Sequence, residues 1–200
     1  MKVIDISNNH MNGQIPNNIC LIFPNMWSLT MAENGFTGCI PSCLGNISSL
    51  KILDLSNNQL SMVKLEQLTT IKFFKLSNNN LGGQILTSVF NSFGLYFLYL
   101  SGNNFWGQIP NFPPPSWKIC YELGLNNNQF SGMLSRCFFN LKHIFTIDLS
   151  KNHFNGPIPV DFCKHGQLEY FNFSEKNLSS SVPSCSNPPQ ITHVHNKWIL

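Results

Sequence analysis

The chain has 200 residues, of which 42% are hydrophobic and only 10% are charged, and its formal net charge is +3. With Arg136 as the only arginine, it has no basic cluster of the kind that nucleic-acid binding requires, so a nucleic-acid partner is not expected. The longest apolar run, 93–100, falls far short of the roughly 20 residues that a membrane-spanning helix needs, and no span is predicted.

The N-terminus has no apolar signal region, because residues 3–7 already have the pattern of a strand. Both ends of the chain fall inside a repeated pattern that normally ends in a polar capping unit. We therefore expect the sequence to be a piece of something longer.

One short pattern recurs from end to end, and its clearest copy is IDLSKNHFNGPIP at 147–159. Its first residues alternate between apolar and polar, which predicts a short strand with one buried face. An Asn follows at a fixed offset, and Gly and Ile-Pro then turn the chain away from the sheet. The Asn recurs in steps of 25, 24, 21, 24, 25 and 24 residues, and a further step of 24 leads to Lys176 in the same position of an eighth copy. The seven positions are Asn9, Asn34, Asn58, Asn79, Asn103, Asn128 and Asn152.

The copies differ in how complete they are. The third has Met62 where the other copies, except the eighth with Ser180, have Gly, and the short step follows it, so an irregular outer arc is expected there. After the fifth copy, three consecutive prolines within 111–117 predict an extended, polyproline-like connection. Residues 1–183 are predicted to form one solenoid of about eight coils, and 184–200 to begin an incomplete ninth coil.

A period in the 20s with L-x-x-L-x-L-x-x-N-x-L inside it is the leucine-rich-repeat pattern. It predicts a fold of the α/β repeat class: a solenoid whose strands stack into a sheet, with little regular helix. Each coil buries its apolar side only against its neighbours. The recurring Asn is predicted to bond backbone groups at the turn and form a structural ladder rather than a catalytic group.

The phrase GQIP at 13–16 and 107–110, and the stretch at 40–61, resemble the plant extracellular class of leucine-rich repeats. That class includes receptor-like proteins, receptor kinases and polygalacturonase inhibitors, and the likeness covers essentially the whole chain. It implies a right-handed, twisted solenoid with a parallel β-sheet on its concave face, a second short strand near the L-x-G-x-I-P turn, and ligand recognition outside the plant cell. The coils that contain Cys are most similar to those of receptor-like proteins.

Four of the seven cysteines form two pairs with the same layout, in which one Cys lies four residues after the Pro of its coil and the other lies two residues after the Pro of the next coil. Equivalent positions one coil apart bring two side chains within disulfide distance, which predicts Cys20–Cys43 and Cys163–Cys185. The alternative is reduced, buried cysteine. Disulfides would indicate a secreted protein, and the odd total leaves at least one free thiol.

Three Asn-x-Ser sequons fit a secreted glycoprotein. Asn46 is the best candidate for glycosylation because it lies in an outer connection. Asn172 falls within the eighth predicted strand and is a weaker candidate, and the third is Asn177.

No cofactor or metal is expected. The pair His193 and His195, and Cys163 with His165, lack a second pair at ligand spacing, so loose polar residues are the better interpretation. No nucleophile or phosphate-loop motif occurs. The carboxylates Asp5, Asp54 and Asp148 lie on strands of separate coils and are predicted to be contact residues rather than an acid/base pair. We therefore predict that the chain is not an enzyme.

The residues that alternate with the buried leucines are mostly small or polar, except in the central coils. There they predict an apolar patch with charge at its margin, the composition of a binding hot spot. A self-packed aromatic row that only stiffens the sheet is the alternative. The predicted ligand-binding residues are Ile52, Phe73, Lys75, Phe97, Tyr99 and Glu122.

The leading functional hypothesis is a fragment of the ectodomain of a plant cell-surface receptor-like protein in defence or developmental signalling. Its partners would be a peptide, protein or glycan ligand and a co-receptor, with membrane contact only through segments outside this chain. The full-length protein would lie at the extracellular face of the plasma membrane. The alternatives are a secreted inhibitor of a pathogen cell-wall hydrolase and a truncated, non-functional remnant.

Overall fold

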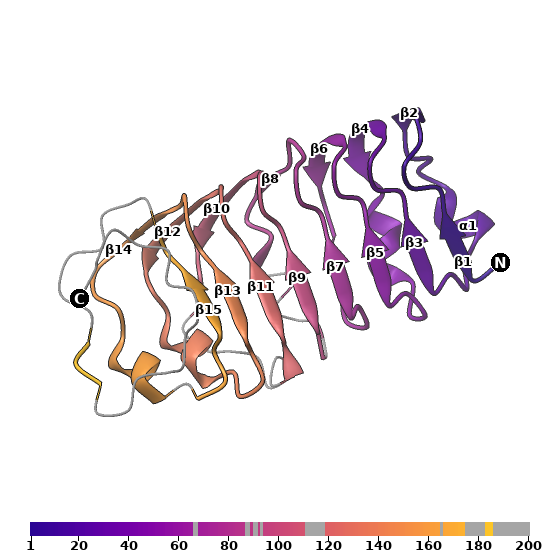
Figure 1. Ribbon diagram of the computed structural model, residues 1–200. Helices are drawn as coiled ribbons and strands as arrows, with labels where there is room; N and C mark the ends of the chain where they lie inside the picture. Colours follow the sequence, from indigo (N-terminus) through magenta and orange to yellow (C-terminus); the bar gives the residue numbers. More distant parts are fainter. Residues whose placement is uncertain are drawn as a thin grey trace.

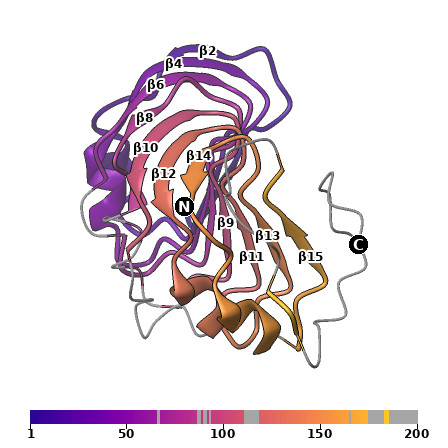
Figure 2. The same ribbon diagram turned by 90° about the vertical axis from the view of Figure 1, so that its left-hand side faces the viewer.

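The computed structural model describes residues 1–65, 68–86, 89, 92, 94–110, 119–164, 166–174 and 183–185. Stacked coils form an elongated, curved solenoid with the N-terminus at one end (Figure 1). Figure 2 looks toward the C-terminal end and shows the coils nested behind one another, with two sheets on different sides.

The first sheet has eight strands in the order β1-β3-β5-β7-β9-β11-β13-β15, and all neighbours are parallel. Each strand pairs with the corresponding strand one coil away, which is the register that a repeated sequence imposes. The strands are β1 (Val3–Asp5), β3 (Ser28–Thr30), β5 (Ile52–Asp54), β7 (Phe73–Lys75), β9 (Phe97–Tyr99), β11 (Glu122–Gly124), β13 (Thr146–Asp148) and β15 (Tyr170–Asn172).

The second sheet has seven parallel strands in the order β14-β12-β10-β8-β6-β4-β2. They lie near the L-x-G-x-I-P turns, where the resemblance implied a second short strand. The strands are β2 (Asn12–Gln14), β4 (Gly35–Ile40), β6 (Gln59–Val63), β8 (Gly82–Gly83), β10 (Asn104–Gln108), β12 (Gln129–Met133) and β14 (His153–Asn155). The pairing of β4 with β6 shifts register between Gly38 and Cys39, beside the coil in which Met62 replaces Gly.

Helical segments are short, and among the described residues none is long and apolar enough to cross a membrane. Those with described bounds are α1 (Ile19–Ile22) and the 3-10 turns η1 (Ser42–Asn46), η3 (Arg136–Asn140) and η4 (Val160–Lys164). The predicted leucine-rich-repeat solenoid with a parallel sheet and little helix is confirmed.

The inward residues of successive coils form one continuous apolar core. In β9, Leu98 is fully buried while Phe97 and Tyr99 on either side of it are partly exposed. This alternation is the predicted period of a strand with one buried face.

The recurring asparagines connect the coils. The Nδ2 group of Asn58 donates to the carbonyl oxygen of Met31 in the preceding coil at 3.0 Å and to two carbonyls of its own coil. Its Oδ1 accepts from the backbone N–H of Phe36 at 3.0 Å. The same arrangement holds at Asn34, Asn79, Asn103, Asn128 and Asn152, and Asn9 donates within its own coil.

The residue before each ladder asparagine has a left-handed backbone, which the repeat pattern did not predict. Asn and Gly tolerate this conformation better than other residues, so the frequent Asn-Asn pairs have a physical reason. The set, with φ between 52° and 65°, is Asn8, Glu33, Asn57, Asn78, Gly102, Asn127 and Lys151.

Two disulfides join neighbouring coils, Cys20–Cys43 with Cα atoms 6.1 Å apart and Cys163–Cys185 with Cα atoms 5.3 Å apart. Each pair spans a single step along the solenoid axis and therefore links one outer connection to the next. Of the free cysteines whose side chains are described, Cys39 is exposed and Cys120 is buried. Several predicted features lie outside the described residues: the polyproline connection 111–117, His165, Lys176, Asn177, and His193 and His195 in the predicted ninth coil.

Candidate ligand-binding surface

The structure brings the predicted ligand-binding residues together on four adjacent strands of the eight-stranded sheet. Ile52, Phe73, Phe97 and Glu122 align in one row across β5, β7, β9 and β11. All four are partly exposed. The Phe73 and Phe97 rings stack with centroids 5.1 Å apart and an interplanar angle of 17°.

The second row along the same strands carries Lys75 and Tyr99, which are paired in register. The Lys75 ammonium lies 5.4 Å from the centroid of the Tyr99 ring, within cation–π distance, and 3.7 Å from a carboxylate oxygen of Asp54. The Tyr99 hydroxyl donates to the Glu122 carboxylate. Desolvation and this carboxylate raise the pKa of Tyr99 above its ordinary range, so the phenol is neutral at physiological pH.

Three further aromatic residues, which the alternation argument missed, extend the patch along its edge. Tyr96, Tyr121 and Phe145 each precede a strand of the sheet, and backbone hydrogen bonds join them in sequence. Their ring centroids are 5.8 Å apart for the first two and 6.0 Å apart for the last two. The Phe97 ring joins this edge to the predicted patch, 5.9 Å from Tyr121.

We call the combined set the aromatic surface: Phe73, Tyr96, Phe97, Tyr99, Tyr121 and Phe145. A signal for the missed three was present, because each stands at the same offset before the ladder Asn of its coil. Strict alternation assigned that offset to the core, but it lies just before the strand, where the ring reaches the rim of the sheet. Lys72 stands at the same offset in the preceding coil, with its ammonium 5.1 Å from the Tyr96 centroid.

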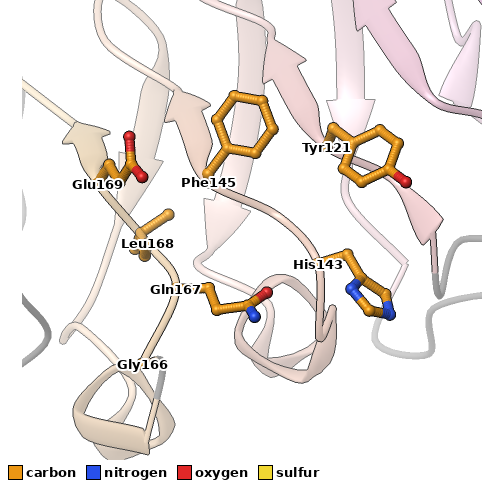
Figure 3. A pocket seen from close by; sticks show the side chains of 7 residues that line it. All are labelled: Tyr121, His143, Phe145, Gly166, Gln167, Leu168 and Glu169. Carbon is orange, nitrogen blue, oxygen red and sulfur yellow. The ribbon is translucent and has the colours of Figure 1, made fainter.

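A pocket of about 540 Å³ opens at the C-terminal end of this surface (Figure 3). Tyr121 and Phe145 contribute aromatic rings, and His143 and the segment 166–169 complete the lining. It offers apolar faces beside an imidazole, the Gln167 amide and the Glu169 carboxylate, so it suits a side chain that has both apolar and polar parts.

The three strand carboxylates named above act locally in the turns. Asp5, Asp54 and Asp148 each accept the backbone N–H two residues ahead, at 3.0 to 3.1 Å. The bond from Ser7 is the main reason that the pKa of Asp5 is lowered. No group of three His, Cys, Asp or Glu residues in the described part of the chain is arranged to hold a metal ion.

The two described sequon asparagines differ in environment. Asn46 is exposed at the end of η1. Asn172 in β15 is only 8% exposed; its Nδ2 lies 3.1 Å from the Tyr170 hydroxyl and its Oδ1 accepts from the Ser174 N–H. Glycan attachment therefore suits Asn46 and would disrupt the bonds of Asn172.

Comparison with known proteins gives consistent results. The Leucine Rich Repeat family model matches residues 1–22, 49–71, 94–115 and 143–165. Cuscuta receptor 1 of Solanum lycopersicum is 38% identical over 116 residues, covering 56% of this chain and 10% of the relative. Receptor-like protein 9a of Arabidopsis thaliana is 32% identical over 143 residues, covering 56% of this chain and 15% of the relative.

Two solved structures have a similar fold. The crystal structure of PEPR1-AtPEP1 matches with a TM-score of 0.81 and 26% identity, over 92% of this chain and 26% of that one. The plant peptide hormone receptor RGFR1 in complex with RGF2 matches with a TM-score of 0.65 and 27% identity, over 86% and 32% of the two chains. This chain thus spans a small part of the length of its relatives. Four segments of the chain match the Leucine Rich Repeat family model, and the sequence is similar to a segment of plant receptor-like proteins.

Proposed function

We propose that this chain is a ligand-binding part of the ectodomain of a plant cell-surface receptor-like protein and that it takes part in defence or developmental signalling. Its ligand is a peptide or a protein, with a co-receptor as a second partner. Similarity to receptor-like proteins supports the receptor class. The likeness to RGFR1, a peptide hormone receptor in complex with RGF2, supports a peptide as the ligand class.

The observation that carries this proposal is the aromatic surface. Partly exposed rings in adjacent coils form a contiguous apolar area, which monomeric proteins seldom expose without a binding role. Rigid aromatic anchors with charge at the margin are the usual composition of a binding hot spot. The pocket beside Tyr121 and Phe145 offers a place for one anchoring side chain of the ligand.

An extracellular location fits the same molecule. The two disulfides are typical of an oxidising compartment, and exposed Asn46 is an acceptor for a glycan there. Binding without catalysis is the activity we propose, because the carboxylates of the sheet are engaged in turn bonds.

The test uses the secreted, disulfide-bonded chain and a display library of random 15-residue peptides selected on it. Selected peptides should lose about tenfold or more in affinity when Phe97 and Tyr121 are both changed to Ala, because truncated anchors leave the ligand without its apolar contacts. The matched control is Val3→Ala, an exposed apolar residue in the same register row of the first strand.

Unchanged affinity in the Phe97/Tyr121 variant, with peptides bound elsewhere, would contradict the proposed surface. A large fall in melting temperature of the double variant would assign the rings to stiffening the sheet. For that reason, single Phe97→Leu and Tyr121→Leu variants, which keep apolar volume, are measured in parallel.

A further inference from the structure

A second pocket lies on the other sheet, away from the aromatic surface. It has a volume of about 540 Å³ and is formed where β8, β10 and β12 run side by side (Figure 1). Its lining residues are Gln84, Leu86, Trp106, Gly107, Gln108, Gln129 and Ser131.

The lining combines an exposed indole with amide and hydroxyl groups. The Trp106 indole is 49% exposed, although burying so large an apolar group is favourable. Trp106 is in register with Gln129, and Gln108 is in register with Ser131. Alternate residues of a strand share one face, so an indole, amides and a hydroxyl present themselves together. None of these lining residues, within the described part of the chain, carries a charge.

Glycines of the next coil leave room for two of the glutamines, Gln84 and Gln108. A Cβ at Gly107 would lie 3.3 Å from Cγ of Gln84, and one at Gly132 would lie 3.1 Å from Cγ of Gln108. Each glutamine therefore lies across the backbone of the neighbouring strand, where a side chain would obstruct it. Both glutamines are exposed, so their amides are accessible to a ligand that lies beside Trp106.

We propose that this pocket binds a neutral oligosaccharide. The C–H face of a pyranose ring packs on the Trp106 indole, because the flat ring has one apolar face and a hydroxylated rim. Each glutamine amide offers donors and an acceptor to those hydroxyls, and the Ser131 hydroxyl offers both. A polyanionic saccharide, or a peptide held by its charges, would find no charged partner in this lining.

The experiment measures binding of cellohexaose, xylohexaose and mannohexaose to the full chain by isothermal titration calorimetry, with hexagalacturonate as the charged comparison. At least one neutral hexasaccharide should bind, and hexagalacturonate should bind more weakly. Trp106→Ala should weaken the binding by about tenfold or more, and Gln129→Ala by a smaller factor. The matched control is Trp27→Ala, which removes an indole of similar exposure at the other end of the solenoid and should leave affinity unchanged.

Absence of binding by all three neutral sugars would overturn the proposal, as would equal loss in the Trp27 and Trp106 variants. Tighter binding of hexagalacturonate, or binding of a neutral peptide in place of every sugar, would also overturn it. If Trp106→Ala lowers the melting temperature, Gln129→Leu in the folded chain decides, because it removes an amide from the lining and keeps the indole, and it should weaken neutral-sugar binding.

Discussion

The hydroxyl of Tyr99 on β9 donates a hydrogen bond to the carboxylate of Glu122 on β11, the next strand of the sheet. This bond ties the polar edge of the aromatic surface to a charged group while leaving the tyrosine ring beside Phe97. Desolvation first, and then Glu122, raise the pKa of Tyr99 above its ordinary value of 10.0.

The Tyr99 pKa gives a pH prediction. A pKa raised in the folded state means that the unfolded chain loses this proton at lower pH than the folded one. The stabilisation of the folded state that this proton provides is therefore fully present below about pH 10, and it is lost as the pH rises above that value. The free energy of unfolding should fall more steeply above about pH 10 in the native chain than in Tyr99→Phe. Urea titrations at several pH values measure the difference.

Tyr170 is the internal control for that comparison. Its pKa is also raised, mainly by desolvation, but it remains in both proteins and cancels from the difference. Parallel stability curves for the native and Tyr99→Phe chains would contradict a strongly perturbed Tyr99.

Much of the fold follows from the repeat alone. A fixed period places every strand beside its equivalent one coil away, so predicting one strand predicts the register of the sheet. The same argument brought Phe73, Phe97 and Tyr99 together, because residues at equal offsets become neighbours. It also placed the cysteines of adjacent coils at bonding distance.

The parts that the sequence did not reveal lie where the strand period ends. Tyr96 and Tyr121 precede their strands, so the alternation pattern wrongly assigned their side chains to the core. The left-handed residue before each ladder asparagine is a backbone property that a mixed set of Asn, Gly, Glu33 and Lys151 does not signal clearly. The Trp106 pocket depends on glutamines lying over glycines of the next coil, a relation between coils rather than within one.

The asparagine ladder can be tested by comparing a buried position with an exposed one. Asn103 is 8% exposed, donates to Leu76 and Leu100 at 2.9 and 3.1 Å, and accepts from the N–H of Leu81. Asn103→Ala leaves several buried backbone groups unpaired and should cost about 3 kcal/mol or more of unfolding free energy. Asn9→Ala, at an exposed position, should cost about 1 kcal/mol or less by the same measure. Equal losses of unfolding free energy in the two variants, measured by chemical denaturation, would show that the hydrogen bonds between coils add nothing to stability.

The left-handed positions predict a stabilising substitution. Glu33 has φ of 57°, a conformation that costs an ordinary side chain roughly 1 kcal/mol and that Asn tolerates better. Glu33→Asn should raise the free energy of unfolding by about 0.5 kcal/mol, as measured by thermal or chemical denaturation. Glu33→Gln is the matched control, because it removes the charge and keeps the strained backbone. An equal gain in both variants would attribute the effect to charge.

Thiol reactivity separates the two described free cysteines. Cys39 is exposed, whereas Cys120 is buried, and desolvation raises the pKa of Cys120 to about 12. Because the thiolate is the nucleophile, the raised pKa leaves far less reactive thiolate at Cys120 than at an ordinary thiol. Iodoacetamide at about pH 8 should therefore modify Cys39 quickly in the native chain and leave Cys120 unmodified until denaturant is added.

Peptide mass spectrometry after a time course of labelling gives both rates in one sample. The disulfide-bonded Cys20 and Cys43 act as the control, because they should label only after reduction. Cys120 that labels as fast as Cys39 would show that the coil around β11 opens readily, since no thiol at 0% exposure reacts without such opening. Labelling of Cys20 and Cys43 without reductant would show that the disulfide between the first two coils is absent. The extracellular location would then lose the support that this disulfide gives.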